Sequence, residues 1–214
     1  MSMRLAQHAD DHQALLLMAP NLRRDHVLSH DDANALERES AAAVINALGG
    51  DVSELKQHWR ELAKHLRATP EVITAYVRAL CRAGADDDAE ALLRKQLERL
   101  WDSSLCALYG EIQCEPPTLQ LRKLEAWSMT RGDDPGLRLA RARQAIRAGL
   151  WAQAREQIAA LMAARPSPLL HQLQAEIAEG MDDHQAAISK RRAGLEMATG
   201  EHFTPRLSAN SEAS

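Results

Sequence analysis

The chain contains 214 residues with a mass of 23.7 kDa, enough for one sizeable domain or a short array of repeats. Hydrophobic residues make up 45% and charged residues 26% of the sequence, but aromatic residues only 3%, and this composition favours helices over sheets. The formal net charge of −4 argues against a dedicated nucleic-acid-binding protein.

Three helices are predicted in the N-terminal third of the chain. The first spans about residues 5–18 and has no evident partner before it. A second is expected to begin at a capping motif, residues 29–32, and to run to Leu48. A third is expected over residues 55–66, with Trp59 on its buried face.

The clearest helical hairpin is predicted for residues 70–103. Thr69 is expected to cap its first helix and Gly84 to end it. The apolar residues of that helix recur at i, i+3, i+4 and i+7 and form one buried stripe: Ile73, Tyr76, Val77 and Leu80. A second helix follows after a short turn, so the two helices must pack antiparallel. Its inner face is expected to carry Ala89, Leu92, Leu93, Leu97 and Leu100.

The same pattern recurs in two further hairpins, predicted for residues 135–166 and 167–198. The helix-ending Gly84 of the first copy corresponds to Gly149 of the second. Such a glycine at fixed spacing, followed by a small residue in the next helix, in units of about 34 residues is typical of tetratricopeptide repeats. Arg138 stands where a strict repeat would carry leucine, so the repeats are degenerate.

These elements predict an all-α fold, a tetratricopeptide-like superhelix (α-solenoid) of antiparallel helix hairpins. We expect a single helical-repeat domain over residues 1–199, with degenerate helical pairs before and between the three hairpins. The remaining residues, 200–214, are rich in Ser, Ala and Glu, and we expect them to form a disordered tail.

Several strings of sequence occur in an order known from one bacterial family. They are LLLMAPNLRRDHVLSHDD (15–32), WRELAKHLRATPEVITAYVRAL (59–80), RLWDSSLCALYG (99–110), LEAW (124–127), DDPGL (133–137) and GLWAQA (149–154). With them the chain resembles, over about residues 13–198, the C-terminal tetratricopeptide region of HemY-type proteins, the bacterial protoheme IX biogenesis proteins.

The resemblance implies a helical-repeat domain of an inner-membrane protein that is tied to the late steps of haem synthesis without being a pathway enzyme. Proteins of this family carry two N-terminal membrane-spanning helices and first repeats that this sequence lacks, so we expect an excised fragment or a short form. The resemblance also implies protein partners, with ferrochelatase or other haem-pathway enzymes as candidates.

Three cysteines, Cys81, Cys106 and Cys114, show none of the spacings typical of metal sites. Their odd number favours reduced thiols in a reducing compartment, and therefore the cytoplasmic face of the membrane. No apolar run reaches the ~18 residues of a membrane-spanning helix, and the chain does not open with a signal-peptide pattern. We therefore expect a soluble domain.

Candidate ligands for a metal or a haem iron are few. His8 and His12 are four residues apart, as are His26 and His30, but no third ligand stands at a motif distance, so we interpret them as exposed polar residues. We interpret the cysteines as small buried hydrophobes. The tryptophans lie on apolar helix faces and are interpreted as core residues rather than as a porphyrin platform: Trp59, Trp101, Trp127 and Trp151.

Arginines recur at matching positions of two repeats. Arg78 and Arg82 correspond to Arg143 and Arg147, in each case one turn apart and away from the buried stripe. In a tetratricopeptide architecture that face lines the concave groove. Because guanidinium groups bind carboxylates through paired hydrogen bonds, we predict a groove for acidic peptide tails or porphyrin propionates. The alternative is a solvated face whose charge is balanced by nearby acidic residues.

The sequence shows no phosphate-binding loop, no nucleophile triad and no carboxylate pair, so it predicts neither an enzyme nor a resident metal or cofactor. We expect a non-catalytic scaffold that organises haem-pathway enzymes at the inner membrane. The alternatives are a carrier that binds porphyrin or haem directly, and a generic peptide-binding adaptor.

Overall fold

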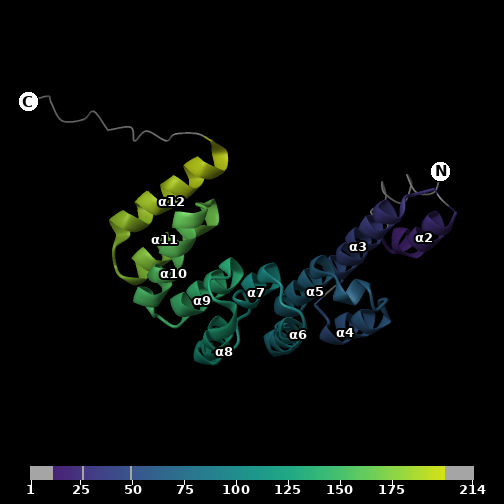
Figure 1. Ribbon diagram of the computed structural model, residues 1–214, viewed down its shortest axis with the longest axis horizontal. Coiled ribbons are helices and arrows are strands. Elements are labelled where there is room, and N and C mark those ends of the chain that lie inside the picture. The colour runs from purple at the N-terminus through teal and green to yellow at the C-terminus, as the bar shows by residue number, and fades with distance from the viewer. Residues whose placement is uncertain (1–11, 26, 49, 201–214) are drawn as a thin grey trace, which may run out of the picture. The chain divides into compact units, whose positions relative to one another are not determined.

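The computed structural model describes residues 12–25, 27–48 and 50–200 (Figure 1). All regular structure in these ranges is helical, and they contain no strand, so the predicted all-α class is confirmed. The chain divides into two compact units, the first ending at Pro116 and the second beginning at Pro117. The expected start of the first helix and residues 201–214 of the expected tail lie outside the described residues.

The first unit is built from helices that pack against their neighbours along the chain. Its elements are α2 (His12–Arg24), α3 (His30–Ala47), α4 (Val52–Glu61), the 3-10 helix η1 (Leu66–Ala68), α5 (Pro70–Arg82), α6 (Asp86–Arg99) and α7 (Ser103–Tyr109). Helix α2 pairs with α3, and α5 packs against α3, α4, α6 and α7. This arrangement of adjacent pairs is that of helical hairpins in an α-solenoid.

Helix starts in this unit follow local sequence signals. The Ser29 hydroxyl accepts a hydrogen bond from the backbone N–H of Asp32 at 3.1 Å, and so caps α3 as predicted. Pro70 is the first residue of α5, where its missing N–H has no consequence. Thr69 precedes it, but its side chain does not cap the helix. Its hydroxyl donates to the carbonyl of His65 at 3.0 Å instead, so the predicted side-chain cap is wrong.

The core of the first unit matches the predicted stripe of α5, whose four apolar residues are all buried. Ala89, Leu93 and Leu97 of α6 are buried against it, whereas Leu92 is only half-buried. Leu100 is 64% exposed because α6 ends at Arg99 and the next residue has an extended backbone. The predicted inward position of Leu100 is therefore wrong.

The second unit consists of five described helices, each packed against the next along the chain. They are α8 (Pro117–Arg131), α9 (Pro135–Arg147), α10 (Trp151–Ala164), α11 (Pro168–Gly180) and α12 (His184–Thr199). Asp134 caps α9 by accepting from the N–H of Leu137 at 2.9 Å, and Ser167 caps α11 in the same way. Helices α9 and α10, and then α11 and α12, occupy the residues for which the last two hairpins were predicted.

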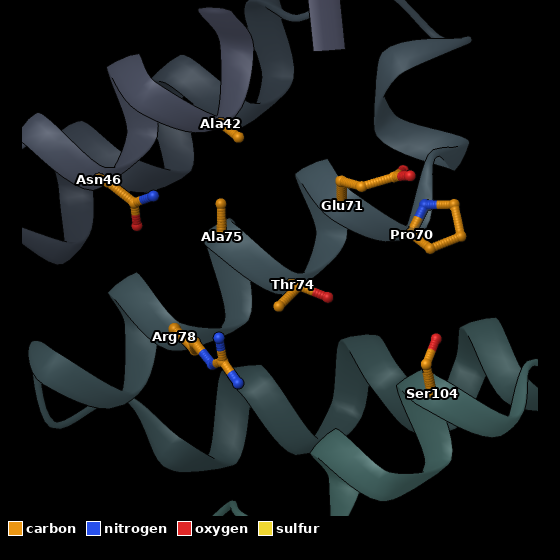
Figure 2. Close-up of a pocket in the computed structure, with 8 residues that line it drawn as sticks. All are labelled: Ala42, Asn46, Pro70, Glu71, Thr74, Ala75, Arg78 and Ser104. Atoms are coloured by element: carbon orange, nitrogen blue, oxygen red, sulfur yellow. The ribbon is translucent and has the colours of Figure 1, made fainter. Parts of the chain in front are cut away.

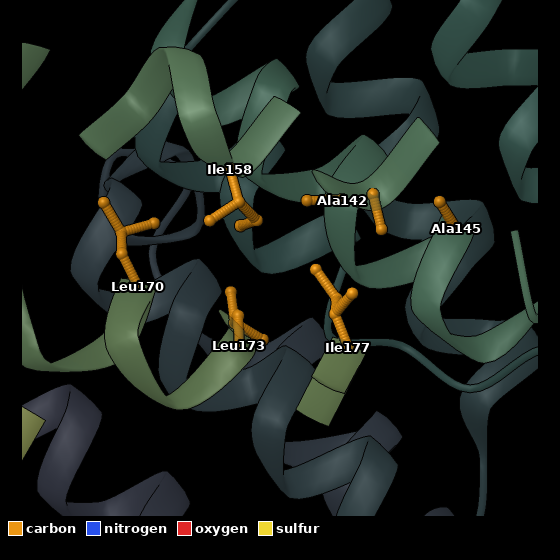
Figure 3. Close-up of a cluster of buried hydrophobic side chains, with 7 residues drawn as sticks. Ala142, Ala145, Ile158, Leu170, Leu173 and Ile177 are labelled. Atoms are coloured by element: carbon orange, nitrogen blue, oxygen red, sulfur yellow. The ribbon is translucent and has the colours of Figure 1, made fainter. Parts of the chain in front are cut away.

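Small residues allow the helices of the second unit to approach closely. Figure 3 shows three residues of α11 pointing toward α9 and α10, where they meet Ala142, Ala145 and Ile158: Leu170, Leu173 and Ile177. Ala142 and Ala154 have no solvent exposure. A larger side chain at either position would force the helices apart.

Candidate functional site

A groove of about 430 Å³ lies between α3, α5 and α7 in the first unit (Figure 2). Ala42 and Asn46 of α3 form one side, and Ser104 of α7 forms another. Helix α5 supplies the rest of the lining: Pro70, Glu71, Thr74, Ala75 and Arg78. The lining of the groove is therefore partly polar and partly apolar, and it includes one cation, Arg78, and one carboxylate, Glu71.

One arginine of the first pair, Arg78, lies at this groove. Arg78 lines it and is exposed, and its guanidinium forms a 3.4 Å ion pair with Glu111. Arg82, one turn further along α5, donates to the side-chain oxygen of Asn46 at 3.3 Å. Ion pairs as exposed as that of Arg78 contribute little stability, so a carboxylate from a ligand is able to replace Glu111.

The second arginine pair lies on α9 in the other unit. Arg143 and Arg147 are half-buried, unlike the exposed pair of α5. Arg147 donates to the side-chain oxygen of Gln144 at 3.1 Å, and Gln144 has no solvent exposure. The structure fixes each pair within its own unit and not one pair relative to the other. The single four-arginine face therefore stays a prediction.

A buried glutamine accounts for an arginine that stands in α9 where a strict repeat would carry leucine. Arg138 is half-buried and donates to the side-chain oxygen of Gln157 at 3.2 Å, while it also pairs with Asp133. Gln157, on α10, is 4% exposed. The hydrogen bond satisfies a polar group that would otherwise be costly to bury. The sequence contained a signal of this pairing, because a glutamine on the inner face of α10 needs a donor from a neighbouring helix.

The tryptophans differ in burial. Trp127 is buried, with the Lys123 ammonium 5.5 Å from its ring centroid. Trp59 is half-buried and stacks on the buried ring of Tyr76, with the two ring centroids 4.2 Å apart and the planes inclined by 3°. Burial raises the pKa of Tyr76 to about 12. Trp101 and Trp151 are half-buried. The prediction that the tryptophans are core residues is thus confirmed for Trp127, whereas the other three are only partly buried.

The three cysteines are free thiols, and Cys106 is fully buried. Burial is the main cause that raises the pKa of Cys81 and of Cys114 to about 12. A nearby carboxylate also raises each pKa: Asp86 acts on Cys81, and Asp87 acts on Cys114. Protonated thiols are poor nucleophiles and poor metal ligands. Cys81 and Cys114 are therefore ill suited to covalent chemistry.

The predicted histidine pairs are described only in part. His12 lies in α2 and His30 begins α3, whereas His8 and His26 lie outside the described residues. Within residues 12–25, 27–48 and 50–200, no group of three or more His, Cys, Asp or Glu side chains is placed to hold a metal ion. In the same ranges, no helix has the length and apolar character needed to cross a membrane.

Comparison with known proteins gives no match to this chain among family models, curated proteins or solved structures.

Proposed function

We propose that the protein is a non-catalytic, tetratricopeptide-like interaction module that binds an acidic segment of a protein partner in the groove between α3, α5 and α7. The observation that carries the proposal is the position of Arg78 on the wall of that groove, with only a weak, exposed ion pair to Glu111. Stacked helical hairpins commonly hold partners in grooves of this kind.

The groove also offers a basis for orienting a bound segment. Glu71 and Arg78 lie seven residues apart along α5, and both line the groove. A segment with a carboxylate near Arg78 and a basic group near Glu71 complements both charges, and the reversed segment meets two repulsions.

The resemblance to HemY-type proteins supports a role in haem biosynthesis. In this proposal the module organises haem-pathway enzymes at the inner membrane, on its cytoplasmic face, and ferrochelatase is the first candidate partner. Holding consecutive enzymes together would limit release of a hydrophobic, reactive tetrapyrrole between them. The partner's acidic segment would occupy the groove at Arg78.

The alternative is a carrier that binds porphyrin or haem directly, for which the arginines would hold the propionate groups. A titration with haemin separates the two functions. A carrier gives a saturable, shifted Soret band at one haemin per chain, whereas a scaffold gives only the spectrum of free haemin.

The scaffold itself is tested by isothermal titration calorimetry with purified ferrochelatase. We expect saturable binding that weakens as the salt concentration rises, because the groove contact is electrostatic. An acidic peptide that binds as tightly as ferrochelatase would favour the generic adaptor. The absence of heat with either ligand would contradict an interaction module that acts on these partners.

A further inference from the structure

A second cleft, also of about 430 Å³, lies in the first unit between α4, η1, α5 and α6. It has no lining residue in common with the groove at Arg78. Four of its lining residues are cationic, and none is acidic: the cations are Lys64, Arg67, Lys95 and Arg99. The apolar part of the lining is formed by Trp59, Ala68, Ile73 and Leu92.

Positive charge at this cleft is not balanced by the protein. Among the residues that the structure describes, none of the four cations forms an ion pair with a carboxylate, although the chain as a whole is acidic. Neighbouring cations behave differently, since Lys56 pairs with Asp88 at 2.6 Å and Arg94 with Glu90 at 3.1 Å. Four like charges around one cleft repel one another, and a bound anion relieves that repulsion.

Two of the four cations have further features that suit anion binding. Arg99 donates to the side-chain oxygen of Gln96 at 3.2 Å. Because Gln96 also lines the cleft, this hydrogen bond holds the guanidinium beside the cleft. The Nε atom of Arg67 is shielded from solvent and has no acceptor among the described residues. A buried donor of this kind is unfavourable until it meets an acceptor.

The apolar side of the cleft includes an aromatic ring that is already fixed in place. Trp59 is stacked on Tyr76, which is only 3% exposed, so its ring does not need to be ordered when a ligand binds. Ile73 is buried beside the cleft, and Leu92, half-buried on α6, gives it a further apolar side chain. Leu92 is the residue of the α6 stripe that the core leaves partly uncovered.

We propose that this cleft binds a small organic polyanion that carries an aromatic ring. The ring contacts the apolar side formed by Trp59 and Leu92, and the anionic groups contact the four cations. Charge-assisted hydrogen bonds to arginine and lysine supply the affinity for phosphate, sulfonate or carboxylate groups. The volume of about 430 Å³ lies within the range of small-molecule sites, about 300–1,000 Å³. This inference is independent of the proposed function, since it concerns other residues and another class of ligand.

The test is binding of 1,3,6,8-pyrenetetrasulfonate, a planar fluorescent tetra-anion, to the full chain by fluorescence anisotropy. We expect saturable binding at one probe per chain. The charge-reversed variant Lys64→Glu/Lys95→Glu should bind about tenfold or more weakly, because two attractions become repulsions. The matched control Arg24→Glu/Arg122→Glu makes the same change of net charge at exposed positions outside the cleft and should bind as the wild type does. Lys95→Gln offers a milder change, expected to weaken binding in the same direction, in case the double variant does not fold.

Three kinds of result would overturn the proposal. The first kind concerns the probe itself: no saturable binding, or equal weakening of binding in the cleft variant and in the control. The second is tripolyphosphate binding as tightly as the probe, which would show that the aromatic ring contributes nothing. The third is hexaglutamate binding more tightly than the probe, which would make the cleft a peptide site.

Discussion

Replacing Gly180 by alanine tests how the hairpins of the second unit pack. Gly180 is the last residue of α11, and a Cβ atom added there would lie 2.3 Å from Cη2 of Trp151 and 2.5 Å and 2.7 Å from two further ring carbons. Trp151 is the first residue of α10 and packs against the buried cluster of the unit. The new methyl group would therefore have to displace the rigid indole ring of Trp151, which packs against the core.

Two opposing effects set the size of the change. Alanine in place of glycine favours a helix by up to about 1 kcal/mol, and by less at a helix end. Adding a methyl group where the space is already filled lowers the free energy of unfolding by about 1–3 kcal/mol. The clash involves three atoms of one ring, so we expect the second effect to win, with a net loss of about 1–2 kcal/mol in the free energy of unfolding.

Urea denaturation followed by circular dichroism measures this loss as a shift of the transition midpoint. Gly50→Ala is the matched control, because nothing lies within 4 Å of a Cβ there, and it should leave the midpoint nearly unchanged. In the background of Trp151→Leu the same Gly180→Ala change should become neutral or stabilising. If Gly180→Ala alone is as stable as the wild type, the described contact between α10 and α11 is wrong.

Two further predictions concern the first unit. Trp59→Ala should lower the free energy of unfolding by about 2–3 kcal/mol, less than for a fully buried aromatic residue, because the ring is half-buried but stacked on Tyr76; an unchanged urea midpoint would contradict that packing. At pH 8.5, below the raised pKa of about 12 for Cys81 and Cys114, both thiols should react with iodoacetamide at least about tenfold more slowly in the folded protein than in urea. Mass spectrometry of the labelled peptides measures the two rates, and equal rates would refute the raised pKa.

The helix pairs could be predicted from sequence because their ends depend on local chemistry. Proline begins α5, α9 and α11, and a glycine with positive φ follows the end of α5 and of α9, at Gly84 (φ 72°) and Gly149 (φ 70°). These residues determine backbone geometry whatever surrounds them. Once these signals had located α5, the spacing of its apolar residues identified the buried stripe, because that spacing marks the inner face of a helix.

The errors arose where a competing local hydrogen bond or a helix end decided the outcome. Thr69 bonds back to His65 of the preceding segment, so a residue type that often caps helices does something else here. Leu100 keeps the apolar spacing of α6 but lies one residue beyond its end.

The candidate sites were predictable only in part. Arg78 and Arg82 were identified from the repeat spacing, and Arg78 does line a groove. The cationic cleft was missed because its four cations come from η1, from the turn before it and from α6, about thirty residues apart in the chain. Each of these lysines and arginines resembles an ordinary surface residue until the fold brings it beside the others.

Charge reversal tests the proposal that this protein is a non-catalytic module that binds its partner through the arginine positions. Binding of purified ferrochelatase is measured by isothermal titration calorimetry for the wild type, for Arg78→Glu, for Arg78→Glu/Arg147→Glu and for the control Arg24→Glu/Arg122→Glu. Arg78 is exposed, so its reversal should change stability by less than about 0.5 kcal/mol and leave the helical content intact. We expect affinity to fall about tenfold or more in both arginine variants and to stay at the wild-type value in the control. Wild-type affinity in the folded Arg78→Glu protein would show that Arg78 does not bind the partner.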